Sequence, residues 1–287
     1  MNLRDWFRKA EEEKFAIGAF NVDNLEILKA ICLAAQKKRS PVMVEFSPGE
    51  VGYFGLENIV DLVANSRDEY KIPILLNLDH AKKVEDCLAA VEREFDNVHF
   101  DGSELELAEN ITSCKKIVEA AHQKGLLVEG EINKISGSSE VHNEEVDLEA
   151  LKKSYTNPEK AAQFVAQTQV DIFAAIFGNI HGTFPVQPDL DIELLKKIRL
   201  AIPNTFISLH GGSGIPAEQV QEAIKVGKIV KVNVNTELRQ AFRDALAEKL
   251  AENPDEYTYY KLVPDVVMTV AAVVEAKFDV FGSANRI

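Results

Sequence analysis

The stretch IPILLNLDHAKKVEDCLAAVEREF (72–95) combines two different patterns of apolar residues. It begins with a short, nearly continuous apolar run that ends in the polar pair Asp79 and His80, and it continues with apolar residues spaced three or four positions apart. The run is typical of a buried strand, and the second pattern is typical of a helix that covers such a strand. The stretch therefore predicts one strand–helix unit of a parallel sheet.

Seven further apolar runs of this kind recur along the chain. They are FAIGAFNV (15–22), PVMVEFS (41–47), NVHFDGS (97–103), GLLVEGEI (125–132), VDIFAAIF (170–177), TFISLHGG (205–212) and IVKVNVN (229–235). Helical patterns such as LEILKAICLAAQKK (25–38) and AENITSCKKIVEAAHQKG (108–125) lie between them. Eight strand–helix units favour a closed α/β barrel, the TIM (βα)8 fold, over an open doubly wound sheet.

Two regions depart from the repeat. The polar segment NKISGSSEVHNEEVDLEALKKSYTNP (133–158) makes the connection after the fifth run unusually long, so it either covers a site or is a mobile, solvated excursion. After the eighth run, TELRQAFRDALAEKLAENP (236–254) and VPDVVMTVAAVVEAKF (263–278) predict extra C-terminal helices. We expect these helices to pack either on the barrel or on another subunit.

Composition limits the classes of function. With 287 residues, 46% of them hydrophobic, and no low-complexity linker, we expect one domain over 1–287. The formal net charge of −14 opposes binding to nucleic acids or anionic membranes. The start MNLRDWFRKAEEEKF lacks the apolar core of a signal peptide, and no apolar run approaches the roughly 18 residues that span a bilayer, so we expect a cytoplasmic protein. Cys32, Cys87 and Cys114 fall in helical patterns without metal-like spacing, which predicts buried, reduced thiols.

Three of the six histidines follow the ends of predicted strands. His80, His181 and His210 each come at the end of a different run, whereas His99 is mid-strand and His122 is helical. The C-terminal strand ends of a barrel meet on one face, and three imidazoles there are typical of a catalytic zinc with an open position for substrate. Any one of these residues alone would be interpreted as a hydrogen-bonded structural histidine.

Glycine-rich turns lie next to two of these histidines. HGT (181–183), HGGSG (210–214) and NVNT (233–236) together offer free backbone N–H groups, polar side chains and the start of a helix, which favour a phosphate. We call these three turns the phosphate cradle. A metal beside a phosphate site indicates a phosphorylated carbonyl substrate, with Asp79 moving protons. The alternative for Asp79 is a cap on the following helix.

The chain resembles the class II, zinc-dependent ketose-bisphosphate aldolases nearly from end to end. The motifs that carry the resemblance are GAFNVDN (18–24), LDH (78–80), FDGSELELAENI (100–111), EGEI (129–132), YTNPEKAAQFV (155–165), HGGSGIP (210–216), KVNVNTELRQAF (231–242) and FGSAN (281–285). The resemblance implies a TIM barrel, a homodimer or homotetramer, and reversible cleavage of a ketose bisphosphate to dihydroxyacetone phosphate and an aldehyde. It leaves open a monovalent cation, Na⁺ or K⁺, beside the Zn²⁺.

The same resemblance implies roles for individual residues. It makes Asp79 the acid/base for the C4 hydroxyl proton, and it makes Glu131 a carboxylate that can bind the metal in a buried position. It assigns substrate binding to Ser47, Gly182, Gly211, Ser213, Asn233, Asn235, Thr236 and Arg239. Arg239 corresponds to an arginine for the distal phosphate, in some members across a subunit boundary.

The chain departs from the family pattern in the rest of the site. Ser139 stands where a catalytic glutamate of the mobile loop is expected, so we assign that role to Glu140, one residue further on. Pro185 replaces a lysine, and Thr258, Tyr259 and Tyr260 replace an Asp-Pro-Arg turn. Fructose 1,6-bisphosphate is the expected substrate. Tagatose 1,6-bisphosphate, a singly phosphorylated ketose, a sugar-phosphate-binding barrel without catalysis and a zinc hydrolase are the alternatives.

Overall fold

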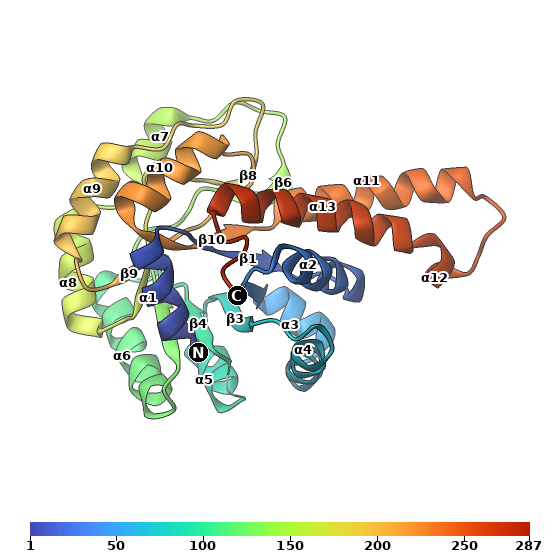
Figure 1. The fold of residues 1–287 in the computed structure, drawn as a ribbon. Coiled ribbons are helices and arrows are strands. Elements are labelled where there is room, and N and C mark those ends of the chain that lie inside the picture. The colour runs from blue at the N-terminus through green and yellow to red at the C-terminus, as the bar shows by residue number, and fades with distance from the viewer. Residues whose placement is uncertain (94) are drawn as a thin grey trace.

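Parallel strands close into a barrel in the computed structural model, which describes residues 1–93 and 95–287 (Figure 1). The strands of the barrel are β1 (Ile17–Asn21), β2 (Val42–Phe46), β3 (Ile74–Ala81), β4 (Asn97–Phe100), β5 (Leu127–Gly130), β7 (Ile172–Ala174), β9 (Phe206–Leu209) and β10 (Ile229–Val234). Strand β1 pairs with both β2 and β10, which closes the barrel. Each of the eight predicted runs contains one strand, so the TIM barrel is confirmed and the open sheet is wrong.

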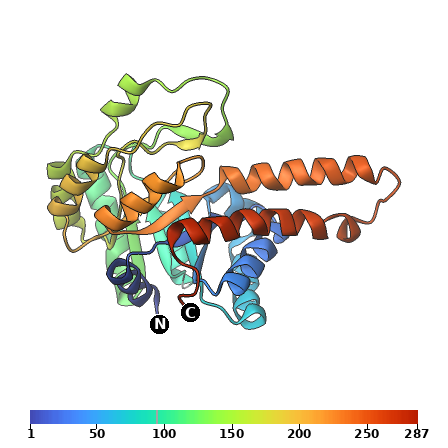
Figure 2. The same ribbon diagram turned by 45° about the horizontal axis from the view of Figure 1, so that its top comes forward.

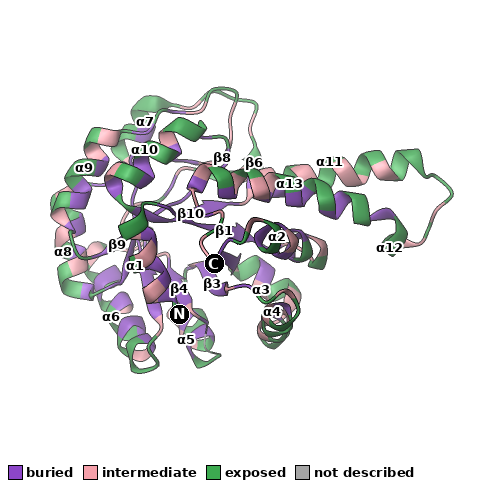
Figure 3. Cartoon of the chain, viewed as in Figure 1, coloured by how far each residue is buried: buried purple, intermediate pink, exposed green. Residues whose placement is uncertain are grey.

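Helices cover the outer faces of the barrel strands, close the N-terminal end of the barrel and form a C-terminal hairpin. They are α1 (Leu3–Glu13), α2 (Leu25–Lys38), α3 (Pro48–Phe54), α4 (Leu56–Tyr70), α5 (Val84–Glu92), α6 (Leu107–Gln123), α7 (Leu148–Lys153), α8 (Pro158–Thr168), α9 (Ile192–Ala201), α10 (Ala217–Gly227), α11 (Thr236–Glu252), α12 (Tyr259–Leu262) and α13 (Pro264–Phe281). Helix α2 spans the residues that its sequence pattern predicted, because the Asn24 side chain caps its first turn. The burial pattern of the ribbon follows this layering, with buried strands and exposed outer helix faces (Figure 3).

The two ends of the barrel interior differ in polarity. Helix α1 closes the N-terminal end, where Trp6 and Phe7 pack in one apolar cluster with inward residues such as Ile17, Leu75 and Phe206. The C-terminal half of the interior is polar instead, with fully buried Glu45, Asn77, His99, Glu129 and Lys231. Buried charges persist only when they are paired or bind a ligand, so this half is where chemistry is expected.

The long segment after β5 lies over the open end of the barrel. Its strand β6 (Gly137–Val141) pairs in parallel with β8 (His181–Thr183) to form a separate two-stranded sheet. Residues of both strands line the cavity below, which agrees with a segment that covers a site.

The last helices form a hairpin that projects from the barrel (Figures 1 and 2). Near its base, α13 packs on α2 and β1, and the Phe278 ring meets Phe20 edge to face at 5.7 Å. Its far end, around α12, carries the strongly exposed side chains of Tyr257 and Tyr260. The base of the hairpin therefore packs on the barrel, which was one of the two arrangements expected from the sequence. The tip of the hairpin extends away from the barrel.

Candidate active site

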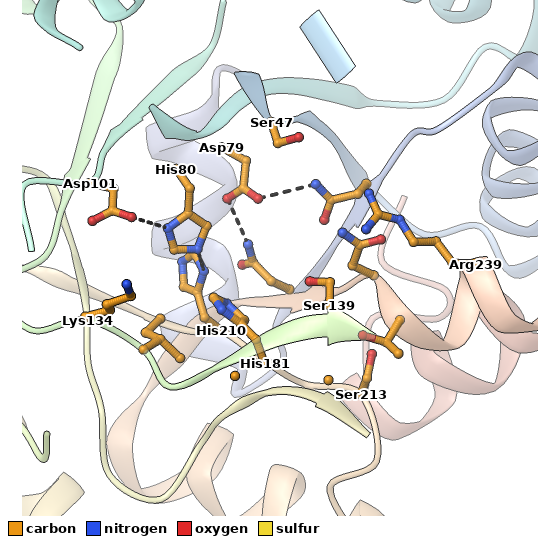
Figure 4. Close-up of a pocket in the computed structure, with 18 residues that line it drawn as sticks. Ser47, Asp79, His80, Asp101, Lys134, Ser139, His181, His210, Ser213 and Arg239 are labelled. Carbon is orange, nitrogen blue, oxygen red and sulfur yellow. Dashed lines mark hydrogen bonds and ion pairs between the residues drawn. The ribbon is translucent and has the colours of Figure 1, made fainter. Parts of the chain in front are cut away.

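A cavity of about 260 Å³ opens at the C-terminal end of the barrel, between the strand ends and the β6–β8 sheet (Figure 4). Of the residues that the sequence assigned to the site, the ones lining this cavity are Ser47, Asp79, His80, His181, Gly182, His210, Gly211, Ser213, Asn233, Asn235, Thr236 and Arg239. Glu131 and Glu140 are outside the lining formed by the described residues. The structure thus brings together side chains from strand ends that are far apart in the sequence.

The rim histidines, His80, His181 and His210, converge on one side of the cavity (Figure 4). The His80 ring centroid lies 5.0 Å from that of His181 and 4.8 Å from that of His210, and the other pair is 6.2 Å apart. Imidazoles this close, from three strand ends, match the arrangement expected of a metal centre with an open position.

Hydrogen bonds to carboxylates determine which ring nitrogens are free. His80 Nδ1 lies 3.2 Å from Asp101 Oδ2, and His210 Nε2 lies 2.8 Å from Glu129 Oε1. Each contact places the ring proton toward the carboxylate, so the lone pairs belong to His80 Nε2 and His210 Nδ1. These two nitrogens face each other at 3.0 Å, a repulsive contact unless a cation lies between them. A divalent metal fits this donor set.

The protonation tendencies of the rim histidines agree with a cation at this place. Burial lowers the pKa of His210 to about 3 and holds the pKa of His181 well below its ordinary value. Burial also opposes charge on His80, but Asp79 and Glu131 raise the pKa of His80 well above its ordinary value. Without a metal, a proton shared by His80 and His210 would supply the positive charge that the surrounding carboxylates favour.

Asp79 and His80 are neighbours in the chain, yet both side chains enter the cavity. Successive residues of a regular strand point to opposite faces, but His80 has a left-handed backbone with φ 49°, which breaks that alternation. Asp79 is buried, and its two oxygens each accept a 3.3 Å bond, one from Asn21 and one from Asn233. Although burial opposes its ionisation, the charges of His80 and Lys231 keep the pKa of Asp79 well below its usual range. Asp79 is therefore an ionised base aimed into the cavity.

Glu131 lies immediately behind His80. Its side chain is 1% exposed, and Oε1 is 3.3 Å from His80 Nδ1. Neither oxygen makes a hydrogen bond with acceptable geometry to any described residue, and burial raises the pKa of Glu131 to about 7. A buried carboxylate without partners next to a histidine cluster fits a metal ligand better than a structural residue.

The phosphate cradle forms on the side of the cavity near α11. Gly182 and Gly211 have φ values of 96° and 64°, and a Cβ on Gly211 would overlap the Ile180 carbonyl. Helix α11 starts beside them at Thr236, and its N-cap residue Asn235 makes no capping bond in the described structure. Within the first turn of α11 the Glu237 N–H already donates to Ser213 Oγ at 3.4 Å. A helix N-terminus without an N-cap side-chain bond, beside glycine turns, favours an anion.

Comparisons with known proteins point to one family. A family model described as fructose-bisphosphate aldolase class-II matches residues 1–286. The chain belongs to this family. It is 39% identical to a fructose-bisphosphate aldolase of Streptococcus pneumoniae (100% of this chain, 99% of the relative) and 36% identical to a 6-phospho-5-dehydro-2-deoxy-D-gluconate aldolase of Shouchella clausii (96% and 92%). The crystal structure of the YdjI aldolase from Escherichia coli K12 superposes with a TM-score of 0.84 at 30% identity, over 99% of this chain and 98% of that one.

Membership makes this aldolase a lyase of a metal-dependent class, in agreement with two groups of side chains that lie close enough to hold a metal ion: Asp79 with His80, His99 and His210, and His80 with Asp101 and Glu131. The match runs through the long β5 segment and the helical hairpin as well as the barrel. In the described part of the aldolase, no helix is long and apolar enough to cross a membrane.

Arg239 is already paired in the aldolase. Its Nε and Nη2 donate to the two Asp23 oxygens at 2.7 and 2.8 Å, and Nη2 also donates to Glu50 Oε1 at 2.9 Å. Burial raises the pKa of Glu50 to about 8, and Glu50 also accepts the Ser47 N–H. Arg239 faces the cavity, but two of its nitrogens, Nε and Nη2, already donate hydrogen bonds to Asp23 and Glu50.

The loop residue Ser139 lines the cavity, whereas Glu140 lies in a neighbouring groove beside Arg239 and Arg243. Glu140 Oε2 accepts a 3.3 Å bond from Ser138 Oγ. Among the other departures from the family pattern, Pro185 is exposed, and Thr258 with its two following tyrosines belongs to the hairpin tip around α12.

Sequence reasoning missed several residues of the site. Asn21, Asp101 and Lys134 line the cavity, and His99 lies directly behind His80 and His210. Asn21 and Asp101 sit at the C-terminal ends of strands, so the criterion that selected the rim histidines would have found them if applied to every polar residue type. The three buried cysteines agree with the expected reduced thiols.

Proposed function

We propose that the protein is a zinc-dependent aldolase that reversibly cleaves fructose 1,6-bisphosphate to dihydroxyacetone phosphate and glyceraldehyde 3-phosphate. The observation that carries the proposal is the 3.0 Å approach of His80 Nε2 and His210 Nδ1 at the cavity beside an ionised Asp79. The names of relatives such as the Streptococcus pneumoniae enzyme support the choice of substrate. We treat 1–287 as one aldolase-type domain.

Binding in this proposal uses both sides of the cavity. The phosphate of the dihydroxyacetone half binds the cradle through Gly182, Gly211, Ser213 and the N-terminus of α11, with Asn233, Asn235 and Ser47 orienting hydroxyl groups. His80, His181 and His210 would hold the zinc. A bound zinc polarises the ketone oxygen and stabilises the negative charge that develops there during cleavage.

Asp79 performs the proton transfer that breaks the bond. It takes the C4 hydroxyl proton, the C4–O bond becomes the carbonyl of the departing aldehyde, and the electron pair of the C3–C4 bond moves onto the ketone half. Asn21 and Asn233 orient the carboxylate from two sides, and its low pKa keeps it ionised at neutral pH.

Glu140 is our proposed acid for the next step, the protonation of C3 in the three-carbon product. Its place in the neighbouring groove means that the loop carrying β6 has to move before the carboxyl group can reach the cavity. Ser139 faces the cavity but has no acid strength suited to this step. The C3 step is therefore the one that depends on loop movement.

Further elements of the proposal concern the surroundings of the site. Glu131 would bind the metal when the metal moves to a deeper position, and Na⁺ or K⁺ would assist phosphate binding.

We also propose a homodimer or homotetramer in which the projecting hairpin contacts another subunit, because its tip exposes Tyr257 (90%) and Tyr260 (74%). The cytoplasmic location expected from the sequence belongs to the same proposal.

A singly phosphorylated ketose is the second candidate substrate. The pairing of Arg239 with Asp23 and Glu50 favours it, because the distal part of the cavity then offers less free positive charge to a second phosphate. A relative from Shouchella clausii is named for a substrate with a single phospho group. Tagatose 1,6-bisphosphate and binding without turnover are the remaining alternatives.

The experiment that tests the proposal is a panel of ketose mono- and bisphosphates, assayed with and without added zinc. A coupled assay that detects dihydroxyacetone phosphate reports cleavage. The expected result is that fructose 1,6-bisphosphate releases dihydroxyacetone phosphate only when zinc is present. Binding of the sugar phosphates without release from any of them would contradict the proposal and favour a non-catalytic barrel.

A further inference from the structure

His99 lies inside the barrel, directly beneath the rim histidines. Along β4, Val98 and Phe100 join the apolar layer under the helices, whereas His99 belongs to the polar interior and is fully buried. Its ring centroid is 4.5 Å from that of His80 and 4.9 Å from that of His210. A fourth imidazole therefore contacts the metal centre without lining the cavity.

The Nδ1 atom of His99 accepts a hydrogen bond from the backbone N–H of His80 at 3.3 Å. This bond supports the left-handed conformation of His80, which residues with a side chain rarely adopt. A ring nitrogen that accepts a bond carries no proton, so the proton of neutral His99 is on Nε2. With Nδ1 engaged and Nε2 protonated, we assign His99 no ligand role, although one of its ring nitrogens lies within 4.8 Å of ligand atoms of Asp79, His80 and His210.

The protonated Nε2 of His99 faces Glu131. It is buried without a hydrogen-bond partner among residues 1–93 and 95–287, and it lies 3.9 Å from Glu131 Oε1. Both Glu131 oxygens also lack a partner within the same described residues. Buried donors and acceptors are nearly always paired, and a shift of roughly 1 Å in the Glu131 side chain would bring this contact to hydrogen-bond length.

The Glu131 side chain can turn toward either of two histidines. Besides its contact with His99, its Oε1 lies 3.3 Å from His80 Nδ1, on the side of the rim histidines. We propose that His99 is a positioning residue whose Nε2–H holds Glu131 below the rim histidines, so that a bound metal keeps three imidazole ligands and an open position. The inference rests on the proposed metal-dependent function. Without this donor, Glu131 can approach the metal and occupy the position that substrate needs.

Two substitutions separate the two contacts of His99. His99→Gln keeps an amide donor near the place of Nε2, whereas His99→Asn keeps a polar group near Nδ1 and loses the donor toward Glu131. Val98→Ala is the matched control, since it removes buried volume from the same strand on the face away from the metal centre. All variants are loaded with Co²⁺, and their visible spectra are recorded without substrate, so this measurement does not depend on aldolase activity.

The expected spectrum of His99→Asn is weaker than that of the wild type, because an added carboxylate ligand raises the coordination number of the metal. Its kcat should fall by roughly 10–100-fold with the metal still bound, and His99→Gln should restore most of both properties. Val98→Ala should lower the melting temperature and leave the spectrum unchanged. A His99→Asn protein with the wild-type spectrum would overturn the proposal, as would loss of bound metal in both His99 variants. If His99→Asn does not fold, a His99→Gln spectrum unlike the wild type would overturn it equally.

Discussion

Arg239 and Asp23 form a two-point ion pair at the rim of the barrel, between the segments that follow the adjacent strands β10 and β1, with N–O distances of 2.7 and 2.8 Å. Glu50 adds a third bond to the same guanidinium at 2.9 Å. The arginine that the sequence assigned to the distal phosphate is therefore already paired with Asp23 and hydrogen-bonded to Glu50 before substrate arrives. A phosphate can bind Arg239 only by competing with Asp23 and Glu50 for the same N–H groups.

We expect the wild type to discriminate weakly between glyceraldehyde and glyceraldehyde 3-phosphate as acceptors for dihydroxyacetone phosphate. Asp23→Asn removes one competing charge, so it should lower KM for the phosphorylated acceptor and leave KM for glyceraldehyde unchanged. A charge-assisted hydrogen bond contributes about 1.5–3 kcal/mol, which corresponds to a change in KM of roughly tenfold or more. Arg239→Ala is the matched control. A strong preference for the phosphorylated acceptor that survives Arg239→Ala would show that another cation, such as Lys134, recognises the phosphate.

Asp79→Ala should retain the metal and lose turnover. Asp79 accepts bonds from Asn21 and Asn233, and in the proposed mechanism His80 alone of the two neighbours would supply a ligand nitrogen, so their roles should be separable. A general acid–base group contributes roughly 10²–10⁴-fold to the rate, and kcat should fall by that factor. Metal content measured by atomic emission should match that of the wild type. Loss of zinc together with activity would make Asp79 a ligand or a structural residue.

The next prediction concerns proton transfer at C3 by the loop residue Glu140 and its neighbour Ser139. If Glu140 serves as the C3 acid, Glu140→Gln should slow the exchange of the C3 proton of dihydroxyacetone phosphate with solvent more than it slows C3–C4 cleavage. Ser139→Glu places a carboxylate directly on the cavity wall and should restore exchange in the Glu140→Gln background. Exchange at the wild-type rate in Glu140→Gln would rule out this role. NMR can follow the exchange of the C3 proton with deuterium from solvent in both variants.

The three cysteines should be inert in the folded protein. Burial raises the pKa of Cys32 and of Cys114 to about 12 and raises that of Cys87 further still. Because the thiolate is the reactive form, titration with a disulfide reagent at pH 8 should be slow for the native protein and fast for all three thiols in denaturant. Rapid reaction of one thiol without denaturant would contradict its burial.

The barrel was predictable because each strand is a run of apolar residues buried on both faces, as in residues 72–79. The rim histidines were predictable because barrel chemistry collects at strand ends. His99 was not, since its importance depends on which way a mid-strand side chain points and on a left-handed residue at His80. The pairing of β6 with β8 and the position of Glu140 depend on contacts between distant loops, for which the sequence has no local signal. The ion pair of Arg239 with Asp23 is missed for the same reason, because the two residues are 216 positions apart.

Metal dependence is the central claim, because imidazoles from three strand ends line one cavity and the ring nitrogens of His80 and His210 face each other at 3.0 Å. The most direct measurement is release of dihydroxyacetone phosphate from fructose 1,6-bisphosphate by protein stripped with a chelator and then titrated with Zn²⁺. We predict that stripping abolishes release and that about one zinc per chain restores it, as expected of a single catalytic site. Cleavage at the full rate by the metal-free protein would contradict the account.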